Sequence, residues 1–192
     1  MKEDLRVQKT KAALFRAFYE LLAEKSYESI TVNELCEKAM VRRATFYKHY
    51  RDKHDFLVGI VKRFRENFHQ MITDENERIS LADYFVKYIS KTINHVISHQ
   101  DIVKNILDSQ MREPFINVVL QINYDDAIEH IKIGESMGLS LSISTEVAAS
   151  MLVGGTSILI IKWFEGGMVI PREKLEADIK AVIMRILEVE KV

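Results

Sequence analysis

The stretch that decides the fold is residues 31–53, which read TVNELCEKAMVRRATFYKHYRDK. Thr31 and Glu34 have the spacing of a capping box, in which a threonine hydroxyl and a glutamate side chain close the first turn of a helix. Apolar residues follow at helical spacing, and a break at 39–41 precedes a second short helical stretch over 42–50. Two short helices joined by such a break predict a helix-turn-helix.

The second helix of this pair is basic on one side. Residues 39–53 contain five Lys or Arg and one Asp, a net charge of +4. Val41, Phe46 and Tyr50 have the spacing to pack against the first helix. The side chains left to face outward are Arg42, Arg43, Thr45 and Lys48. A short helix with such a face fits the major groove of B-DNA, which is about 12 Å wide, so double-stranded DNA is the predicted partner.

The charge of the whole chain is uneven. Its 192 residues carry 27 Lys and Arg against 28 Asp and Glu, and this net charge of −1 excludes a uniformly basic nucleic-acid coat. Residues 1–70 hold 15 basic and 10 acidic residues, whereas residues 71–192 hold 12 and 18. A basic first third on an acidic remainder indicates a module that faces a polyanion, joined to a part with a different role.

The composition predicts an all-α fold. Seven Gly and two Pro are few for this length, and 47% hydrophobic residues favour long helices over many short strands with tight turns. The periodicity predicts about nine helices and no convincing strand. We expect a three-helix helix-turn-helix domain over residues 1–52, a linking helix over 53–72 and a helical bundle over 73–192.

Other classes of protein are not favoured. The single cysteine, Cys36, excludes an intramolecular disulfide, and the start of the chain lacks the apolar run of a signal peptide, so we expect a cytoplasmic protein. The longest uncharged stretch, 147–161, is shorter than the roughly 20 residues of a membrane helix, and we expect a buried helix there instead. His95 and His99 have a metal-binding spacing but no evident third ligand, so neither a metal nor a cofactor is predicted. No nucleophile–base pair or phosphate-binding loop is visible, which argues against an enzyme.

Residues 7–61 resemble the DNA-binding domain of the tetracycline-repressor (TetR) family of bacterial transcriptional regulators. The run Ala44–Tyr50, followed by Asp52 and Lys53, is similar to a family pattern in which small, Thr, hydrophobic, Tyr, His and aromatic positions precede a lysine that opens the fourth helix. This resemblance covers less than a third of the chain. It implies a DNA-binding head followed by an all-helical domain that senses a ligand and forms a dimer.

The resemblance assigns a role to each matching residue. It implies that four residues contact phosphates: Thr31, Tyr47, His49 and Lys53. It places three residues at base edges: Arg42, Arg43 and Thr45. Two positions depart from the family pattern. Met40 stands where the family usually has a turn glycine, and a left-handed backbone there would cost roughly 1–2 kcal/mol. Arg42 stands where the family has a capping Ser or Thr, and we hypothesise that it trades that cap for a guanine or phosphate contact.

The second domain offers candidate effector and dimer residues. Aromatic, Met or His positions in its central helices are candidate effector contacts: Tyr84, Tyr88, His95, Met111, Phe115, Tyr124 and Met151. Ordinary core packing is the alternative for each of them. The candidate dimer residues, mostly small enough for close helix approach, are Ala148, Ser150, Gly154, Gly155 and Trp163. A tightly packed helix within one chain is the alternative there.

Together these features predict a homodimeric, ligand-responsive repressor that binds a near-palindromic operator through two recognition helices. One alternative is a DNA-binding regulator controlled by a protein partner instead of a small molecule. A second alternative is a helical interaction module or an enzyme in which the basic helix is only a surface.

Overall fold

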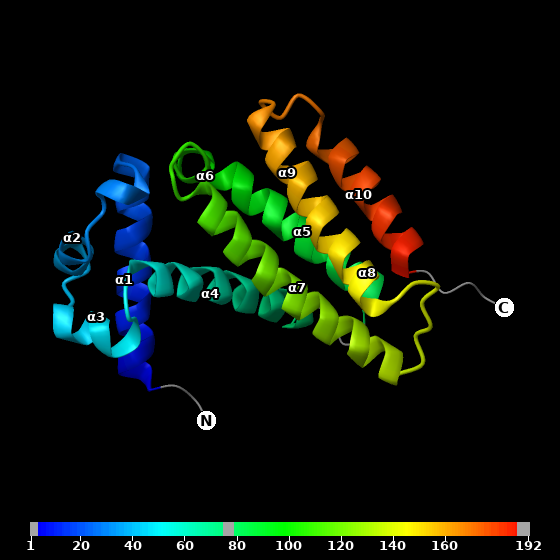
Figure 1. Cartoon of the computed structure of the whole chain (residues 1–192), viewed down its shortest axis with the longest axis horizontal. Coiled ribbons are helices and arrows are strands. Elements are labelled where there is room, and N and C mark those ends of the chain that lie inside the picture. Colours follow the sequence, from blue (N-terminus) through cyan, green and yellow to red (C-terminus); the bar gives the residue numbers. More distant parts are fainter. Residues whose placement is uncertain (1–3, 75–78, 188–192) are drawn as a thin grey trace. The chain divides into compact units, whose positions relative to one another are not determined.

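The computed structural model describes residues 4–74 and 79–187, and all regular structure in these residues is helical (Figure 1). The predicted all-α fold is confirmed. The described part holds nine α-helices when the continuous run α8–η2–α9 is counted as one. The chain divides into two compact units: an N-terminal unit of Met1–Arg63 with His99–Val118, and a C-terminal unit of Phe64–Ser98 with Val119–Val192.

The N-terminal unit is built around three phenylalanine rings. Its elements are α1 (Leu5–Glu24), the 3-10 turn η1 (Tyr27–Ser29), α2 (Val32–Lys38), α3 (Arg43–His49), α6 (Gln100–Leu107) and the first parts of α4 (Lys53–Asp74) and α7 (Arg112–Ser136). Phe18, Phe46 and Phe56 are buried, and the ring centroid of Phe56 lies 5.3 Å from that of Phe18 and 5.7 Å from that of Phe46. These rings join α1, α3 and α4 into one small core.

The N-terminal unit also includes a segment from the middle of the chain. Helix α6 packs on α1, and the Asn105 side-chain amide donates to the Leu22 carbonyl over 2.7 Å. The compact units therefore do not follow the order of the chain. The expected division into a head over 1–52, a linking helix over 53–72 and a helical bundle over 73–192 stays a prediction, and residues 75–78 lie outside the described residues.

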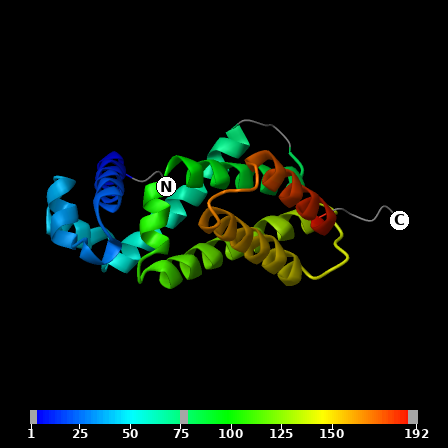
Figure 2. The ribbon, with the colours of Figure 1, turned by 90° about the horizontal axis from the view of Figure 1, so that it is seen from above.

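The C-terminal unit is a bundle of long helices. Its elements are α5 (Leu81–Ser98), α8 (Thr145–Ser150), the π-helical segment η2 (Met151–Gly155), α9 (Thr156–Glu165), α10 (Arg172–Leu187) and the second parts of α4 and α7. Helix α5 lies against both α9 and α10 (Figures 1 and 2). Ile93, Ala127, Ile131 and Ile183 are fully buried and form the centre of its core.

Side chains or glycines close several helix ends. The Asp52 carboxylate accepts the backbone N–H of Asp55 over 2.8 Å at the start of α4, and the Ser144 hydroxyl accepts that of Val147 over 3.3 Å at the start of α8. Beyond the end of α7, Gly138 has a φ of +100°, a conformation that favours glycine. Local side chains therefore decide where these helices begin and end.

The stretch 147–161, for which a buried helix was expected, lies within the longer helical run Thr145–Glu165. This run is only partly buried, so the expectation of a buried helix is wrong. Among the described residues, it is the one helix long and apolar enough to cross a membrane. Its 18-residue apolar stretch has a mean hydropathy of 1.7, and 33% of that stretch is buried. One such helix is weak evidence for a membrane span, because a core helix passes the same test. One face of this run exposes large apolar side chains, and the other, with Ala148, Leu152 and Trp163, faces the core.

Candidate DNA-binding site and a buried polar network

The turn of the helix-turn-helix keeps a left-handed backbone without glycine. Met40 has a φ of +53° and its side chain is 94% exposed, so the strained backbone causes no side-chain clash. The Val41 backbone N–H donates to the Cys36 carbonyl over 2.9 Å and closes the turn. The departure expected at Met40 is therefore real, and it costs roughly 1–2 kcal/mol relative to an ordinary backbone.

The two helices of the motif begin differently. The Thr31 hydroxyl accepts the backbone N–H of Glu34 over 3.2 Å, as the capping box predicts. The side chain of Lys25 pairs with Glu34, and this ion pair holds the pKa of the Glu34 carboxyl below its usual range. At the start of α3, the Arg42 side chain makes no capping hydrogen bond to the described residues. The second departure is thus also real, and it leaves the exposed Arg42 guanidinium outside the helix.

Helix α3 stands on a rigid aromatic base. Phe46 and Tyr50 are buried, and their ring centroids lie 5.7 Å and 5.0 Å from that of Phe56 at the start of α4. A Cβ at Gly59 would lie 2.8 Å from the Tyr50 ring, so glycine allows the ring to pack directly on the α4 backbone. Of the three residues predicted to form the inner face, Phe46 and Tyr50 are buried, with Phe56 of α4 as a contact, and Val41 is partly buried.

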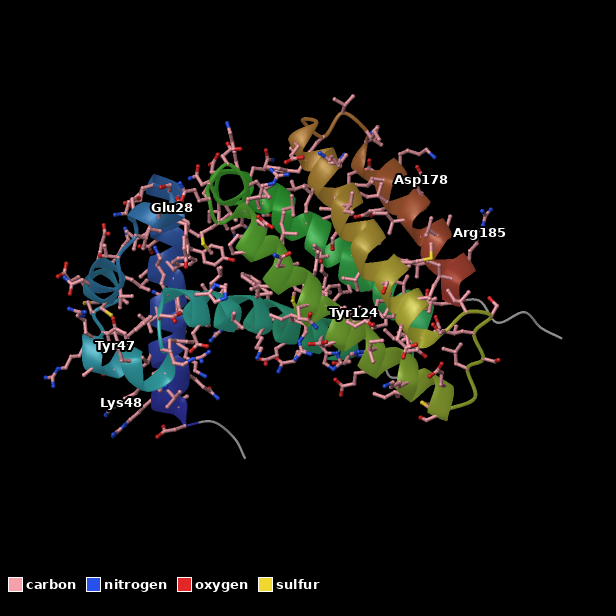
Figure 3. The ribbon with its side chains drawn as sticks, viewed as in Figure 1. Glu28, Tyr47, Lys48, Tyr124, Asp178 and Arg185 are labelled. Carbon is pink, nitrogen blue, oxygen red and sulfur yellow. The ribbon has the colours of Figure 1, made fainter. Side chains whose placement is uncertain are left out.

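The outer face of α3 is basic and exposed. The Arg43 guanidinium carbon lies 5.9 Å from the centroid of the Tyr47 ring, one helical turn away, and the Tyr47 side chain is 47% exposed. Tyr47 and Lys48 project outward from the helix (Figure 3). Thr45 and His49 are partly buried beside this face. Seven of the eight predicted DNA contacts thus lie on α3 or at the N-caps of α2 and α3, and their roles stay predictions.

Lys53, the eighth residue, is bound differently from the expectation. Its ammonium group donates to the carbonyl oxygens of Tyr27 and Ile30, each over 2.8 Å. An ammonium held by two protein carbonyls has one N–H left for another partner. The sequence did not predict these two hydrogen bonds within the unit, and the expected phosphate contact of Lys53 stays a prediction.

Three of the seven candidate effector residues lie together in the C-terminal unit. Tyr84, Tyr88 and His95 follow one another along α5 and contact aromatic rings of α4: the His95 ring centroid lies 4.6 Å from that of Phe64, and the Tyr88 centroid lies 5.7 Å from that of Phe68. The Tyr88 hydroxyl also donates to the side-chain oxygen of Asn123 on α7 over 2.7 Å. These side chains form the contact layer between α4, α5 and α7.

Of the other four candidates, Tyr124 packs against the same hydrophobic core as Tyr84 and Tyr88, and the remaining three lie elsewhere. Met111 and Phe115 belong to the N-terminal unit. Tyr124 is half-buried on α7 (Figure 3). The Met151 side chain is 57% exposed, so this residue lies on the outer face of the apolar helix and not in an interior site.

A buried polar network surrounds Tyr84. Asp126, which is 7% exposed, accepts a hydrogen bond from the Arg65 guanidinium over 2.8 Å and one from the Tyr84 hydroxyl over 3.5 Å. Its carboxylate also lies 3.5 Å from Nδ1 of His130, whose ring stacks on Tyr84 with centroids 4.4 Å apart. On the other side, Nδ1 of His69 lies 3.2 Å from the Tyr84 hydroxyl. Burial, with a smaller contribution from Asp126, raises the pKa of Tyr84 above its usual value.

The charged members of this network were not predicted from the sequence. The usable signal was the spacing of Asn123, Asp126 and His130, which places three polar residues on one side of α7 among buried positions such as Ala127 and Ile131. Their partners on α4 and α5 lie 35 to 61 residues away in the chain, so periodicity could not pair them.

The candidate dimer residues fall into two groups. Ala148 and Trp163 are buried in the core of their own unit, and the Trp163 indole N–H donates to the Ile170 carbonyl over 2.7 Å. The chain itself covers both residues, and their expected place at a dimer interface stays a prediction. Ser150 and Gly155 are exposed, and Gly154 is partly exposed, on the outer face of the same helix.

Among the described residues, no three His, Cys, Asp or Glu side chains are grouped so that they could hold a metal ion. His95 and His99 do not share a helix, because α5 ends at Ser98 and His99 is the N-cap of α6.

An exposed basic helix on a helix-turn-helix base defines a helix-turn-helix DNA-binding protein. Residues 14–60 match the family described as bacterial regulatory proteins, tetR family. The chain thus carries the DNA-binding domain of that family, and the resemblance stated for residues 7–61 is confirmed. The family is one of transcriptional regulators and not of enzymes.

One curated protein resembles part of the chain in sequence, and solved structures resemble it in fold. The chain is 44% identical over 61 residues to YxbF of Bacillus subtilis, an uncharacterised HTH-type transcriptional regulator; the aligned part is 31% of this chain and 16% of that protein. A TetR-family regulator of Syntrophomonas wolfei shares the fold with a TM-score of 0.71 at 14% identity, over 96% of this chain and 98% of the other. FadR of Bacillus subtilis, solved with stearoyl-CoA, shares it with a TM-score of 0.60 at 17% identity, over 92% and 99%.

Proposed function

We propose that the protein is a sequence-specific transcriptional repressor that binds a near-palindromic operator as a homodimer and releases it when a small-molecule effector binds. The observation that carries the proposal is the outer face of α3. Arg43, Tyr47 and Lys48 are exposed on a helix whose inner side is fixed by buried rings, within a tetR-family DNA-binding domain. A rigid, basic, exposed helix is what reading of the major groove requires.

The test is selection of duplexes from a random pool, followed by fluorescence anisotropy at several salt concentrations. We expect a near-palindromic sequence whose half-sites lie about 34–36 Å apart, or a multiple of this, because two recognition helices of a dimer enter grooves on one side of the DNA. The logarithm of its affinity should fall with the logarithm of the salt concentration by about 0.9 per phosphate contact. A pool that yields no preferred sequence would refute the proposal. On a promoter that contains the selected site, the protein should lower transcription in vitro.

The dimer is proposed to form through the outer face of the apolar helix Thr145–Glu165. This face carries large exposed apolar side chains, among them Met151 at 57%, Ile158 at 60% and Leu159 at 47%. Val182 on α10 is 48% exposed as well. Apolar surface of this kind favours a protein partner, and a two-fold operator implies that the partner is a second copy. Ser150 and Gly155 on this face would allow close approach of the second helix.

The variant Ile158→Arg is expected to raise the dissociation constant of the dimer at least about tenfold, because it places a charge in an apolar interface. Sedimentation equilibrium measures the dissociation constant. The matched control is Ile133→Arg on α7, where the replaced side chain is 51% exposed, and this variant should dimerise normally. A wild-type protein that stays monomeric at micromolar concentration, or equal dissociation of both variants, would argue against this interface.

The effector is proposed to act on the contact layer that Tyr84, Tyr88 and His95 share with α4 and α7. The support is the buried polar network, because such networks can hold two arrangements that a ligand distinguishes. An effector should raise the thermal stability of the protein and weaken operator affinity about 5- to 150-fold. An effector that leaves operator affinity unchanged contradicts the mechanism, and control by a protein partner then becomes the better hypothesis.

A further inference from the structure

Lys53 and Tyr27 bind each other through both their side chains and their backbones. The Lys53 ammonium donates to the Tyr27 and Ile30 carbonyl oxygens, each over 2.8 Å, and lies 4.1 Å from the centroid of the Tyr27 ring. In return, the Tyr27 hydroxyl donates to the Lys53 carbonyl oxygen over 3.2 Å. Tyr27 is buried, so this reciprocal contact is shielded from water on one side.

This contact lies between the start and the end of the helix-turn-helix. Tyr27 and Ile30 stand at the two ends of η1, directly before Thr31, the N-cap of α2. Lys53 is the first residue of α4, three residues after Tyr50, the C-cap of α3. The contact therefore joins the chain that enters the helix-turn-helix to the chain that leaves it. Lys53 follows Tyr27 by 26 residues and Ile30 by 23 residues in the sequence.

The contact also restricts what the ammonium can do elsewhere. Two of its three N–H groups are used by carbonyls, and the ring covers part of its surface. Burial lowers the pKa of the Lys53 ammonium below its usual value, which agrees with a group drawn out of water. If the ammonium moved to a phosphate, the Tyr27 and Ile30 carbonyls would lose their charged partner. Lys48, by contrast, is exposed on the outer face of α3.

We infer that Lys53 is a positioning residue of the DNA-binding head, whose ammonium fixes the two ends of the helix-turn-helix to each other and does not contact phosphate. This inference rests on the proposed function only for its effect on DNA binding. The contact of Lys53 with Tyr27 and Ile30, which we call the Lys53 clasp, is a property of the folded N-terminal unit. Because it holds the cap of α2 against the start of α4, it keeps α2 and α3 in one fixed arrangement for the operator.

The test compares Lys53→Met, which keeps the aliphatic stem and removes the charge, with Lys62→Met at an exposed position further along α4. The full-length proteins are followed by thermal unfolding and by anisotropy with the selected duplex over a range of salt concentrations. We expect Lys53→Met to lower the unfolding temperature by about 4–8 °C, through the loss of a charged hydrogen-bonding group. The salt slope of duplex affinity should stay that of the wild type, and preference for the selected duplex over random DNA should fall. Lys62→Met should leave the unfolding temperature and this preference unchanged.

The two roles of Lys53 predict opposite results. If Lys53 contacts phosphate in both protomers of the proposed dimer, Lys53→Met would make the salt slope less steep by about 1.8, or about 0.9 for each protomer, and that result overturns the inference. An unfolding temperature equal to that of the wild type overturns it as well. If Lys53→Met does not fold, Tyr27→Phe removes the returning hydroxyl bond and keeps every charge; it should lower the unfolding temperature at an unchanged salt slope. If the wild type binds no duplex specifically, the proposed function fails, while the unfolding temperatures still test the Lys53 clasp.

Discussion

The variant Arg43→Ala is expected to bind the selected operator more weakly than the wild type by about 5- to 150-fold for each half-site, a loss of about 1–3 kcal/mol for each protomer of the dimer. Arg43 is exposed in the first turn of α3, where a recognition helix reads bases, and its guanidinium lies over the Tyr47 ring. That contact restricts the side chain before DNA arrives, so less conformational entropy is lost on binding. Anisotropy with the operator and with single-base variants of it measures the effect.

Base preference separates a reading contact from a simple loss of charge. At the position that Arg43 reads, the variant should bind all four base pairs with similar affinity, whereas the wild type should favour one. Lys62→Ala removes the same charge from an exposed position on α4 and is the control, with unchanged base preference. If Arg43→Ala weakens every sequence alike, Arg43 contacts the backbone only and the assigned role is wrong.

The variant Asp126→Ala is expected to lower the free energy of unfolding by about 3 kcal/mol. Removal of Asp126 leaves the Arg65 guanidinium without its carboxylate in the C-terminal unit, and Nε of Arg65 already has no hydrogen-bond partner among the described residues. The loss is placed at the low end of the range for such pairs because the Arg65 side chain is 29% exposed and can be partly hydrated. For a chain of this size, thermal unfolding should shift down by about 6–12 °C.

Two further variants isolate the buried pair as the cause. Asp125→Ala changes the neighbouring residue, which is exposed and accepts a hydrogen bond from Gln121 one turn away, and it should alter stability by less than about 0.5 kcal/mol. Arg65→Met, added to Asp126→Ala, removes the stranded charge and should recover part of the loss. Equal stabilities of Asp126→Ala and Asp125→Ala would show that the network contributes nothing to the fold.

Much of the DNA-binding head could be predicted because its signals are local. The capping box at Thr31 and the missing cap at Arg42 each involve residues a few positions apart, and helix geometry brings such residues together in any fold. The inner and outer faces of α3 follow from helical periodicity in the same way. A specific motif, matched by the family at residues 14–60, added the function to that local structure.

The sequence by itself thus determined the helices, their ends, the basic face of α3 and the class of protein. Only the tertiary structure decided which side chains have hydrogen-bond partners within the protein. Lys53 donates to the Ile30 carbonyl, Asp126 accepts from Arg65 and Tyr84, and Trp163 donates to the Ile170 carbonyl. It also showed that one face of the apolar helix Thr145–Glu165 stays exposed, which composition could not distinguish from burial. The physical reason is the same in each case. Periodicity reports the face of a helix on which a residue lies, but the partner on that face is set by packing between segments distant in the chain.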